Sequence, residues 1–251
     1  MGAWFRSTVE FAPGVPRVYC FPHAGGNAAM FSDWQSLLGD DAAIAAVIMP
    51  GRGHRYAEAA PTTIDEYADA AAEAVAADAT GPFVLFGHSL GALVAFEVAR
   101  RLRADPRLRH LVASGASAPA LMPSERVKRA AGLRGREFAE AVGAFGGLPP
   151  EIVAAEELHD LLLPGVQADF RLVASYRYRP AGPLAIGLTV VNGADDDHVT
   201  PERLAGWADE TTGPVERRWA PGGHFYLRGQ PRAITDVLRR VSASGQSDLL
   251  I

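Results

Sequence analysis

One serine of this sequence stands in a setting typical of a nucleophile. Residues 86–91 read F-G-H-S-L-G and follow directly on the apolar run at 83–86. Gly87 and Gly91, two positions before and after Ser89, suit a sharp turn between a strand and a helix, where larger side chains would collide. Such a turn holds a hydroxyl above a sheet, with the start of a helix behind it. We therefore predict that Ser89 attacks an acyl carbon.

A serine nucleophile needs a base, and His224 is the best placed of the 7 histidines. It ends the segment A-P-G-G-H after the last predicted strand, and the two glycines allow that loop to turn back toward Ser89. We expect His54, in the loop P-G-R-G-H-R, to lie either on the surface or at the rim of a pocket. The polar surroundings of His110 and His159 predict solvated side chains.

The acid that orients the histidine is expected between the serine and the histidine, after the penultimate strand. Residues 190–200, V-V-N-G-A-D-D-D-H-V-T, offer three aspartates in a row. The usual spacing, a glycine followed by two variable residues and the acid, selects Asp196 when counted from Gly193. Asp195 and Asp197 remain alternatives. The cluster with His198 matches neither a calcium loop nor a zinc site, so we expect no metal.

A glycine-rich turn supplies the remaining part of such a site. Residues 21–26, F-P-H-A-G-G, follow the first predicted strand, and a turn of this form directs backbone N–H groups at a substrate oxygen. We predict two donors for the oxyanion, the backbone amides of Ala24 and of Leu90, the residue after the nucleophile. The alternative is a tight turn between a strand and a helix that binds nothing.

The elements around these motifs predict an α/β fold with a mostly parallel, doubly wound sheet. Short apolar runs alternate with segments of helix length, and continuous apolar runs are typical of strands buried on both faces. We expect strands at 18–21, 44–49, 83–86, 111–114, 188–192 and 215–219, and helices at 30–38, 64–79, 90–103, 201–210 and 232–241. Thr63 and Glu66 have the spacing of a capping box at the start of the second helix.

Residues 119–183 interrupt this alternation. They hold amphipathic pieces at 137–145, 151–162 and 167–176 and no convincing strand. A long helical insertion of this kind is typical of a lid or a pocket wall, and the alternative is extra helices packed at the edge of the sheet. We predict one domain over 1–251 that includes this insertion, with a loosely ordered tail at 242–251.

The composition excludes several other classes of protein. The chain has 251 residues, 48% of them hydrophobic, enough for a large core. The balance of 24 Lys+Arg against 29 Asp+Glu argues against nucleic acid as a partner. A single cysteine forms no internal disulfide, no apolar stretch is long enough to span a membrane, and the N-terminus lacks the pattern of a signal peptide. We expect a cytoplasmic protein.

Five motifs together resemble the type II thioesterases of polyketide and non-ribosomal peptide synthesis. They are F-P-H-A-G-G, M-P-G-R-G-H-R, F-G-H-S-L-G-A-L-V-A-F-E, N-G-A-D-D-D-H-V-T and P-G-G-H-F-Y-L, in this order along most of the chain. The resemblance implies an α/β-hydrolase fold in which residues 119–183 match the family's helical lid. It also implies Ser89 as nucleophile, Asp196 as orienting acid and His224 as base. Ala194 departs from the family, which often has an acid there.

The resemblance further implies hydrolysis of acyl groups from the phosphopantetheine arm of acyl or peptidyl carrier proteins, through an acyl-serine. No cofactor is expected beyond the arm that the substrate carries, and the family is monomeric. Three other functions stay open on the sequence alone. They are a product-releasing thioesterase, a general carboxylesterase, and a binding protein of the same fold that has lost catalysis, although this chain keeps every residue of the site.

Overall fold

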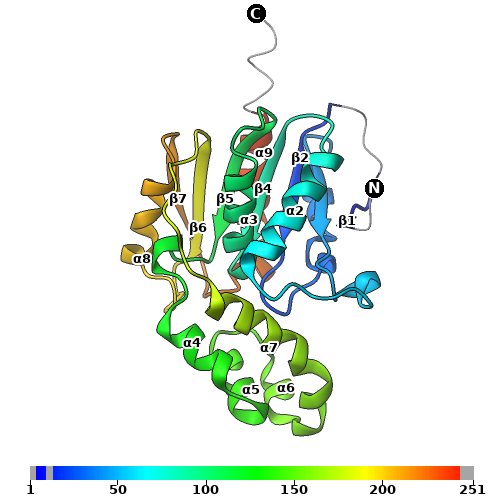
Figure 1. The fold of residues 1–251 in the computed structure, drawn as a ribbon, viewed down its shortest axis with the longest axis vertical. Helices are drawn as coiled ribbons and strands as arrows, with labels where there is room; N and C mark the ends of the chain where they lie inside the picture. Colours follow the sequence, from blue (N-terminus) through cyan, green and yellow to red (C-terminus); the bar gives the residue numbers. More distant parts are fainter. Residues whose placement is uncertain (1–3, 10–13, 244–251) are drawn as a thin grey trace, which may run out of the picture.

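The computed structural model describes residues 4–9 and 14–243. Its centre is a sheet with the strand order β1-β3-β2-β4-β5-β6-β7 (Figure 1). All pairs but one are parallel, which confirms the prediction of a mostly parallel sheet, and the exception is the unpredicted first strand, which is antiparallel to its neighbour. The strands are β1 (Phe5–Arg6), β2 (Arg17–Phe21), β3 (Ala43–Val47), β4 (Phe83–His88), β5 (Leu108–Ser114), β6 (Gly187–Gly193) and β7 (Val215–Ala220).

Helices cover both faces of this sheet, which explains why its central strands read as continuous apolar runs. The helices α2 (Ile64–Asp78) and α3 (Leu90–Arg101) lie on the face that Figure 1 shows in front. The helices α1 (Trp34–Leu38) and α9 (Arg232–Ala243) pack together on the opposite face. All six residues of β4 are buried between these two layers, so the strand that leads to Ser89 is firmly held.

The start of α2 follows the predicted cap. The Thr63 side chain accepts a hydrogen bond from the Glu66 amide at 3.1 Å. The Glu66 carboxylate also accepts from the amide and the hydroxyl of Thr62 at 2.8 and 2.9 Å. The first turn is therefore held by side chains from both ends of the predicted capping box.

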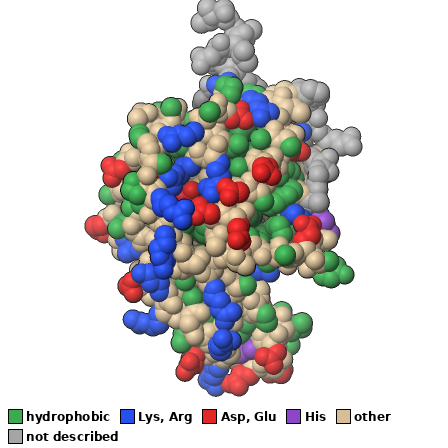
Figure 2. Space-filling model, in the orientation of Figure 1, with side chains coloured by type: hydrophobic (Ala, Val, Ile, Leu, Met, Phe, Trp, Pro, Cys, Tyr) green, Lys and Arg blue, Asp and Glu red, His purple; other side chains and the backbone are tan. Residues whose placement is uncertain are grey.

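Ion pairs join α2 to α3 on the exposed face of the front layer. Arg101 pairs with Asp65 at 3.0 Å, with Asp69, and with Glu97 of its own helix at 2.9 Å. Figure 2 shows this face, where basic side chains form a column beside acidic ones. Asp65 and Asp69 are exposed, whereas Arg101 is half-buried and Glu97 is buried, so the two pairs that join the helices contribute little to stability.

The insertion, residues 119–183, forms a helical layer of its own below the sheet in Figure 1. It contains α4 (Glu125–Gly132), α5 (Gly135–Ala144), α6 (Pro150–Ala154) and α7 (His159–Ser175). Its helices bury a separate cluster centred on Phe138, Leu163 and Phe170. The insertion contains no strand, in agreement with the sequence pattern.

The structure differs from the sequence pattern of the insertion at two places. The amphipathic piece at 151–162 is not one helix but is divided among α6, a short 3-10 turn and the start of α7, and α7 continues through Pro164. Pro164 is the sixth residue of α7, past the first turn, so the helix lacks one backbone hydrogen bond there. The helix α4 was not predicted, since it buries only the small side chains of Ala130 and Ala131. The predicted loose tail lies largely outside the described residues.

Within the described ranges, no helix combines the length and apolar character that crossing a membrane requires.

Candidate active site

The turn between β4 and α3 holds Ser89 in a strained backbone conformation. Ser89 has φ 55° and ψ −115°, and it is the only non-glycine residue with positive φ among the residues that the structure describes. The residues two positions before and after Ser89 must be glycines. A Cβ on Gly87 would lie 2.0 Å from the Gly91 carbonyl oxygen, and one on Gly91 would lie 2.1 Å from that of Phe21. The predicted collisions are thus confirmed, and the strain points to function.

The structure brings His224 and Asp196 into direct contact. His224 Nδ1 lies 2.8 Å from Asp196 Oδ2, and the two side chains are 8% and 1% exposed. Because a carboxylate only accepts hydrogen bonds, Nδ1 donates the proton and Nε2 keeps its lone pair. Ser89 and His224 line the same cavity. The site therefore contains the serine, the imidazole and the acid that acyl transfer requires.

The loops that carry Asp196 and His224 are bonded to each other. The Ala194 amide donates to the Ala220 carbonyl at 2.8 Å, and the Asp195 amide donates to Gly222 at 3.0 Å. Gly193 permits this contact, since a Cβ there would lie 2.2 Å from the Gly223 carbonyl oxygen. A steric requirement thus explains the glycine in the turn that carries the acid. Without a side chain at this position, the loops of Asp196 and His224 approach closely enough for the carboxylate to contact the imidazole.

Only one of the three aspartates faces the histidine. Asp196 is buried, and its Oδ1 accepts from the His198 amide at 2.9 Å. Burial raises the pKa of this carboxyl, but the hydrogen bonds and charge of His224 and the His198 amide outweigh it, so the pKa lies below its ordinary range. Asp195 and Asp197 are exposed, and Asp197 pairs instead with Arg126 at 3.4 Å.

The predicted oxyanion donors belong to the same cavity as Ser89. Ala24 and Leu90 both line it, and its volume is about 60 Å³. Leu90 is the first residue of α3, so its amide has no acceptor within the helix and is available to a ligand. Most of the apolar side chains in the rest of the wall come from the insertion: Met122, Val127, Val142, Phe145, Phe170 and Val173. The cavity therefore places an apolar wall close to the two backbone amides that could donate hydrogen bonds to an oxyanion.

A buried network supports the histidine from behind, and sequence reasoning missed it. His88 Nδ1 lies 2.9 Å from the Ser114 hydroxyl, which lies 2.7 Å from the Tyr226 hydroxyl. The His88 ring lies 5.1 Å from the His224 ring. Burial lowers the pKa of His88 well below its ordinary range. A neutral imidazole thus packs against His224 without repelling the charge that develops during catalysis.

Two further histidines border the site as neutral groups. Burial lowers the pKa of His23 to about 4, and burial together with Arg126 and His224 lowers that of His198 to about 4. The His198 ring packs on Phe145 at 3.9 Å and lies 5.7 Å from the His224 ring. These rings form part of the wall of the site, since neither is positively charged near neutral pH.

The insertion is tied to the oxyanion turn by one buried carboxylate. Asp169 of α7 accepts from the Gly25 amide at 2.7 Å and from Arg52 at 2.8 Å. Arg52 also donates to the Gly165 carbonyl at 2.7 Å. Burial raises the pKa of Asp169, while Arg52 and the Gly25 amide oppose that rise. The position of the Ala24 amide is therefore coupled to α7, a connection that no local motif predicts.

The structure also shows the environments of three other histidines, for which the sequence left alternatives or predicted a solvated side chain. His54 lines a second cavity, which favours the pocket-rim interpretation. His159 is only 5% exposed and contacts the Ile152 carbonyl at 3.0 Å, so the prediction of a solvated side chain is wrong. His110 is half-buried beside Thr189, and burial lowers its pKa to about 4. Over residues 4–9 and 14–243, no cluster of three or more His, Cys, Asp or Glu side chains could bind a metal.

Comparisons with known proteins place this geometry in a family. The model of the thioesterase domain matches residues 16–244. The thioesterase PikA5 of Streptomyces venezuelae is 34% identical over 235 residues, which cover 91% of this chain and 82% of that protein. The linear gramicidin dehydrogenase LgrE of Brevibacillus parabrevis is 32% identical over 241 residues, 94% of this chain and 90% of its own.

A solved structure agrees in fold as well as in sequence. The type II thioesterase BorB from the borrelidin biosynthetic cluster superposes with a TM-score of 0.84 at 32% identity. The match covers 95% of this chain and 97% of that one. The insertion is therefore part of the shared fold rather than an addition peculiar to this chain.

Proposed function

Because this chain belongs to the thioesterase domain family, we propose that it hydrolyses acyl groups from the phosphopantetheine arm of acyl or peptidyl carrier proteins. The observation that carries the proposal is the His224–Asp196 contact at 2.8 Å, beside a strained Ser89 in the same cavity. The similarity to the thioesterase PikA5 and to a type II thioesterase of the borrelidin biosynthetic cluster supports this class of substrate. We assign Ser89 as nucleophile, Asp196 as orienting acid and His224 as base.

The reaction proceeds in two steps that use the same groups. His224 Nε2 takes the Ser89 proton as the serine oxygen attacks the thioester carbon, and the Ala24 and Leu90 amides stabilise the oxyanion. The C–S bond of the tetrahedral intermediate then breaks, His224 gives its proton to the departing sulfur, and the thiol leaves an acyl-serine behind. Water, activated by His224, attacks that ester and frees the carboxylic acid and the serine. Asp196 holds the imidazole in its tautomer and stabilises its charged form.

The apolar wall of the cavity fits an acyl chain. Six aliphatic or aromatic side chains of the insertion line the cavity together with Ser89, and none of the described residues that line it is Asp, Glu, Lys or Arg. Burying such a chain stabilises the complex by about 0.8 kcal/mol per methylene. We propose that the enzyme removes stalled or incorrect acyl groups from carrier proteins. The alternative role is the release of the finished product.

A comparison of matched substrates tests the proposal. The same acyl group is attached to pantetheine through sulfur and, in an analogue, through oxygen. A thioesterase of this kind cleaves the thioester with the higher kcat/KM, and Ser89→Ala abolishes both reactions. Faster cleavage of the oxoester would favour a general carboxylesterase. Formation of a cyclic product from a carrier protein loaded with a full-length acyl chain would favour product release.

A further inference from the structure

A hollow lined mainly by arginines lies where α3 forms ion pairs with α2. Its volume is about 260 Å³. Its walls come from three parts of the chain: the start of α2, the end of α3 with the turn after it, and the linker 176–186 that leads from α7 to β6. No residue of the cavity at Ser89 belongs to this arginine hollow. The basic side chains that line it are Arg100, Arg101, Arg103, Arg177 and Arg179.

A buried carboxylate holds the walls of the arginine hollow together. Glu97 is 5% exposed and accepts hydrogen bonds from Arg100 at 2.8 Å and from Arg101 at 2.9 Å. It also accepts from the Tyr176 hydroxyl at 2.8 Å. Arg100 in turn donates to the Arg179 carbonyl at 2.7 Å. Because these bonds join α3 to the linker, the two guanidinium groups are in place before any ligand binds.

The carboxylates nearby do not balance the positive charge of the arginine hollow. Five guanidinium groups line it, against the two carboxylates of Glu97 and Asp65. Asp69 adds a third carboxylate from outside the hollow through its pair with Arg101. Two positive charges therefore remain among these groups, in a chain whose formal net charge is −5. Such a local excess attracts an anion.

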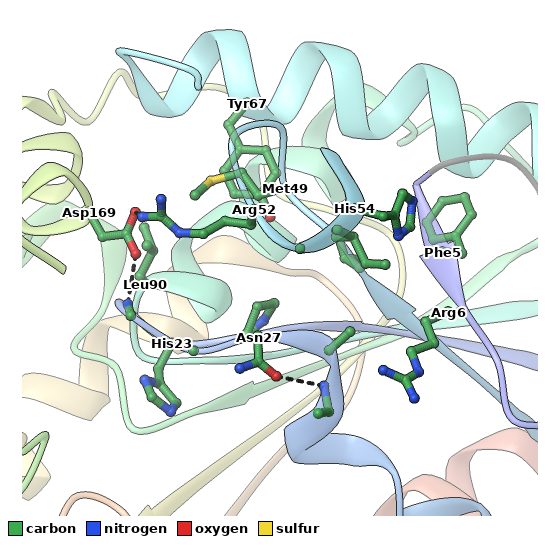
Figure 3. A pocket seen from close by; sticks show the side chains of 18 of the residues that line it. Phe5, Arg6, His23, Asn27, Met49, Arg52, His54, Tyr67, Leu90 and Asp169 are labelled. Atoms are coloured by element: carbon green, nitrogen blue, oxygen red, sulfur yellow. Dashed lines mark hydrogen bonds and ion pairs between the residues drawn. The ribbon is translucent and has the colours of Figure 1, made fainter. Parts of the chain in front are cut away.

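Two of the five arginines form no ion pair with a carboxylate of the described residues. Arg103 donates to two backbone carbonyls through Nη2 alone, and Arg177 donates to two backbone carbonyls through Nη1 alone. The Nε–H and the other Nη group of each side chain remain available as donors. In the second cavity, which Figure 3 shows, Arg52 instead lies against Asp169 and is paired with it at 2.8 Å.

The available donors fit phosphate oxygens, because the planar fork of an arginine binds two such oxygens at once. The volume lies just below the range of about 300–1,000 Å³ that is typical of cavities for drug-sized ligands, so it suits a compact anion. We propose that the arginine hollow binds the diphosphate group of a small molecule, with Arg103 and Arg177 as its main ligands. The bound group joins α3, which begins next to Ser89, to the linker that follows the insertion. This site is independent of the proposed function.

Isothermal titration at a constant, low ionic strength measures the binding directly. The probes are inorganic diphosphate and ADP, and the comparison anions are sulfate and chloride. The wild type should bind one diphosphate per chain, more tightly than either comparison anion. Arg103→Gln and Arg177→Gln should each raise the Kd about three- to tenfold, because each removes a charge-assisted contact at an exposed site.

The matched control for the charge is Arg217→Gln. The Arg217 side chain is exposed on β7, does not line the arginine hollow and donates only to a backbone carbonyl, so this variant should keep the wild-type Kd. A further variant tests the volume. Ala181 lines the hollow and is exposed, so Ala181→Phe fills space without removing a buried group, and it should raise the Kd at least threefold. All four variants alter exposed side chains, so their urea midpoints should stay near that of the wild type.

The outcomes decide between a built site and a diffuse positive surface. Diphosphate that does not bind, or that binds no more tightly than sulfate, would overturn the proposal. An unchanged Kd in Arg103→Gln, Arg177→Gln and Ala181→Phe would also overturn it, because the anion would then bind elsewhere. An equal rise of the Kd in Arg217→Gln would indicate a general loss of positive charge and would contradict a specific site. Equal affinities for ADP and inorganic diphosphate would support recognition of the diphosphate group alone, and tighter binding of ADP would support a nucleotide as its source.

Discussion

Replacing Asp196 with asparagine tests how the buried acid acts on His224. The asparagine oxygen can still accept the His198 amide, which now bonds Oδ1 at 2.9 Å. Its amino group then faces His224 Nδ1, where the carboxylate accepts at 2.8 Å. That contact requires an unprotonated Nδ1, so the proton moves to Nε2. The nitrogen that must take the Ser89 proton is thereby blocked.

The expected loss of kcat follows from the fraction of the His224 imidazole that remains in the active tautomer. Both partners are almost fully buried, so water does not replace the lost interaction. A block of this kind lowers kcat by about 10³- to 10⁴-fold in serine hydrolases, which corresponds to about 4–5.5 kcal/mol. The fold should lose only about 1 kcal/mol, since most hydrogen bonds are kept.

The assay is kcat for a pantetheine thioester, with urea unfolding as the check on stability. Asp195→Asn and Asp197→Asn are the matched controls, because both side chains are exposed and neither contacts His224. They should keep nearly full activity. A variant Asp196→Asn with more than a tenth of the wild-type kcat, or an equal loss in either control, would refute the assignment of the acid.

Three further predictions concern the backbone, the insertion and pH. Gly91→Ala should lower the free energy of unfolding by at least about 2 kcal/mol, because its Cβ would lie 2.1 Å from a backbone oxygen. At Gly132 a Cβ meets nothing within 4 Å, so Gly132→Ala should cost nothing, and equal urea midpoints for the two variants would disprove the close approach. Asp169→Ala should lower kcat about tenfold with little change in KM, since the Gly25 amide loses its acceptor, and Asp169→Asn should restore part of it. An unaltered kcat in the alanine variant would break the link between α7 and the oxyanion turn. The pKa of His110 lies at about 4, below its unfolded value near 6.5, so only the unfolded chain takes up this proton and stability falls as pH drops through that window. His110→Gln should make the fall shallower by up to about 1.4 kcal/mol per pH unit, and identical slopes would contradict the burial of a neutral ring.

The parts of the fold that sequence predicts well are those with strong local patterns. The run F-V-L-F and the glycines around Ser89 are sufficient to predict β4 and the turn after it. Burial on both faces requires apolar residues, the close approach of the backbone requires glycines, and both requirements can be recognised in the sequence. The triad follows from the order of motifs along the chain. In contrast, β1 has only two residues, Phe5–Arg6, and no pattern can form over that length.

The contacts that sequence could not predict are those made at long range. Asp169 and Arg52 are 117 positions apart, and neither lies in a motif that names the other as a partner. The support of His224 by His88 depends on Ser114 and on Tyr226, and these three supporting residues come from three different elements. Such contacts arise from the packing of the insertion and the loops, and only the tertiary structure reveals them.

The most direct test of the account is the mass of an acyl-loaded carrier protein after incubation with the enzyme. The wild type should return the carrier to the mass of its free phosphopantetheine form and release the acyl group as an acid. Ser89→Ala should leave the loaded mass unchanged. If the wild type also leaves the carrier loaded, while it still cleaves a small ester through Ser89, then thioester hydrolysis on carriers is not the function of this site.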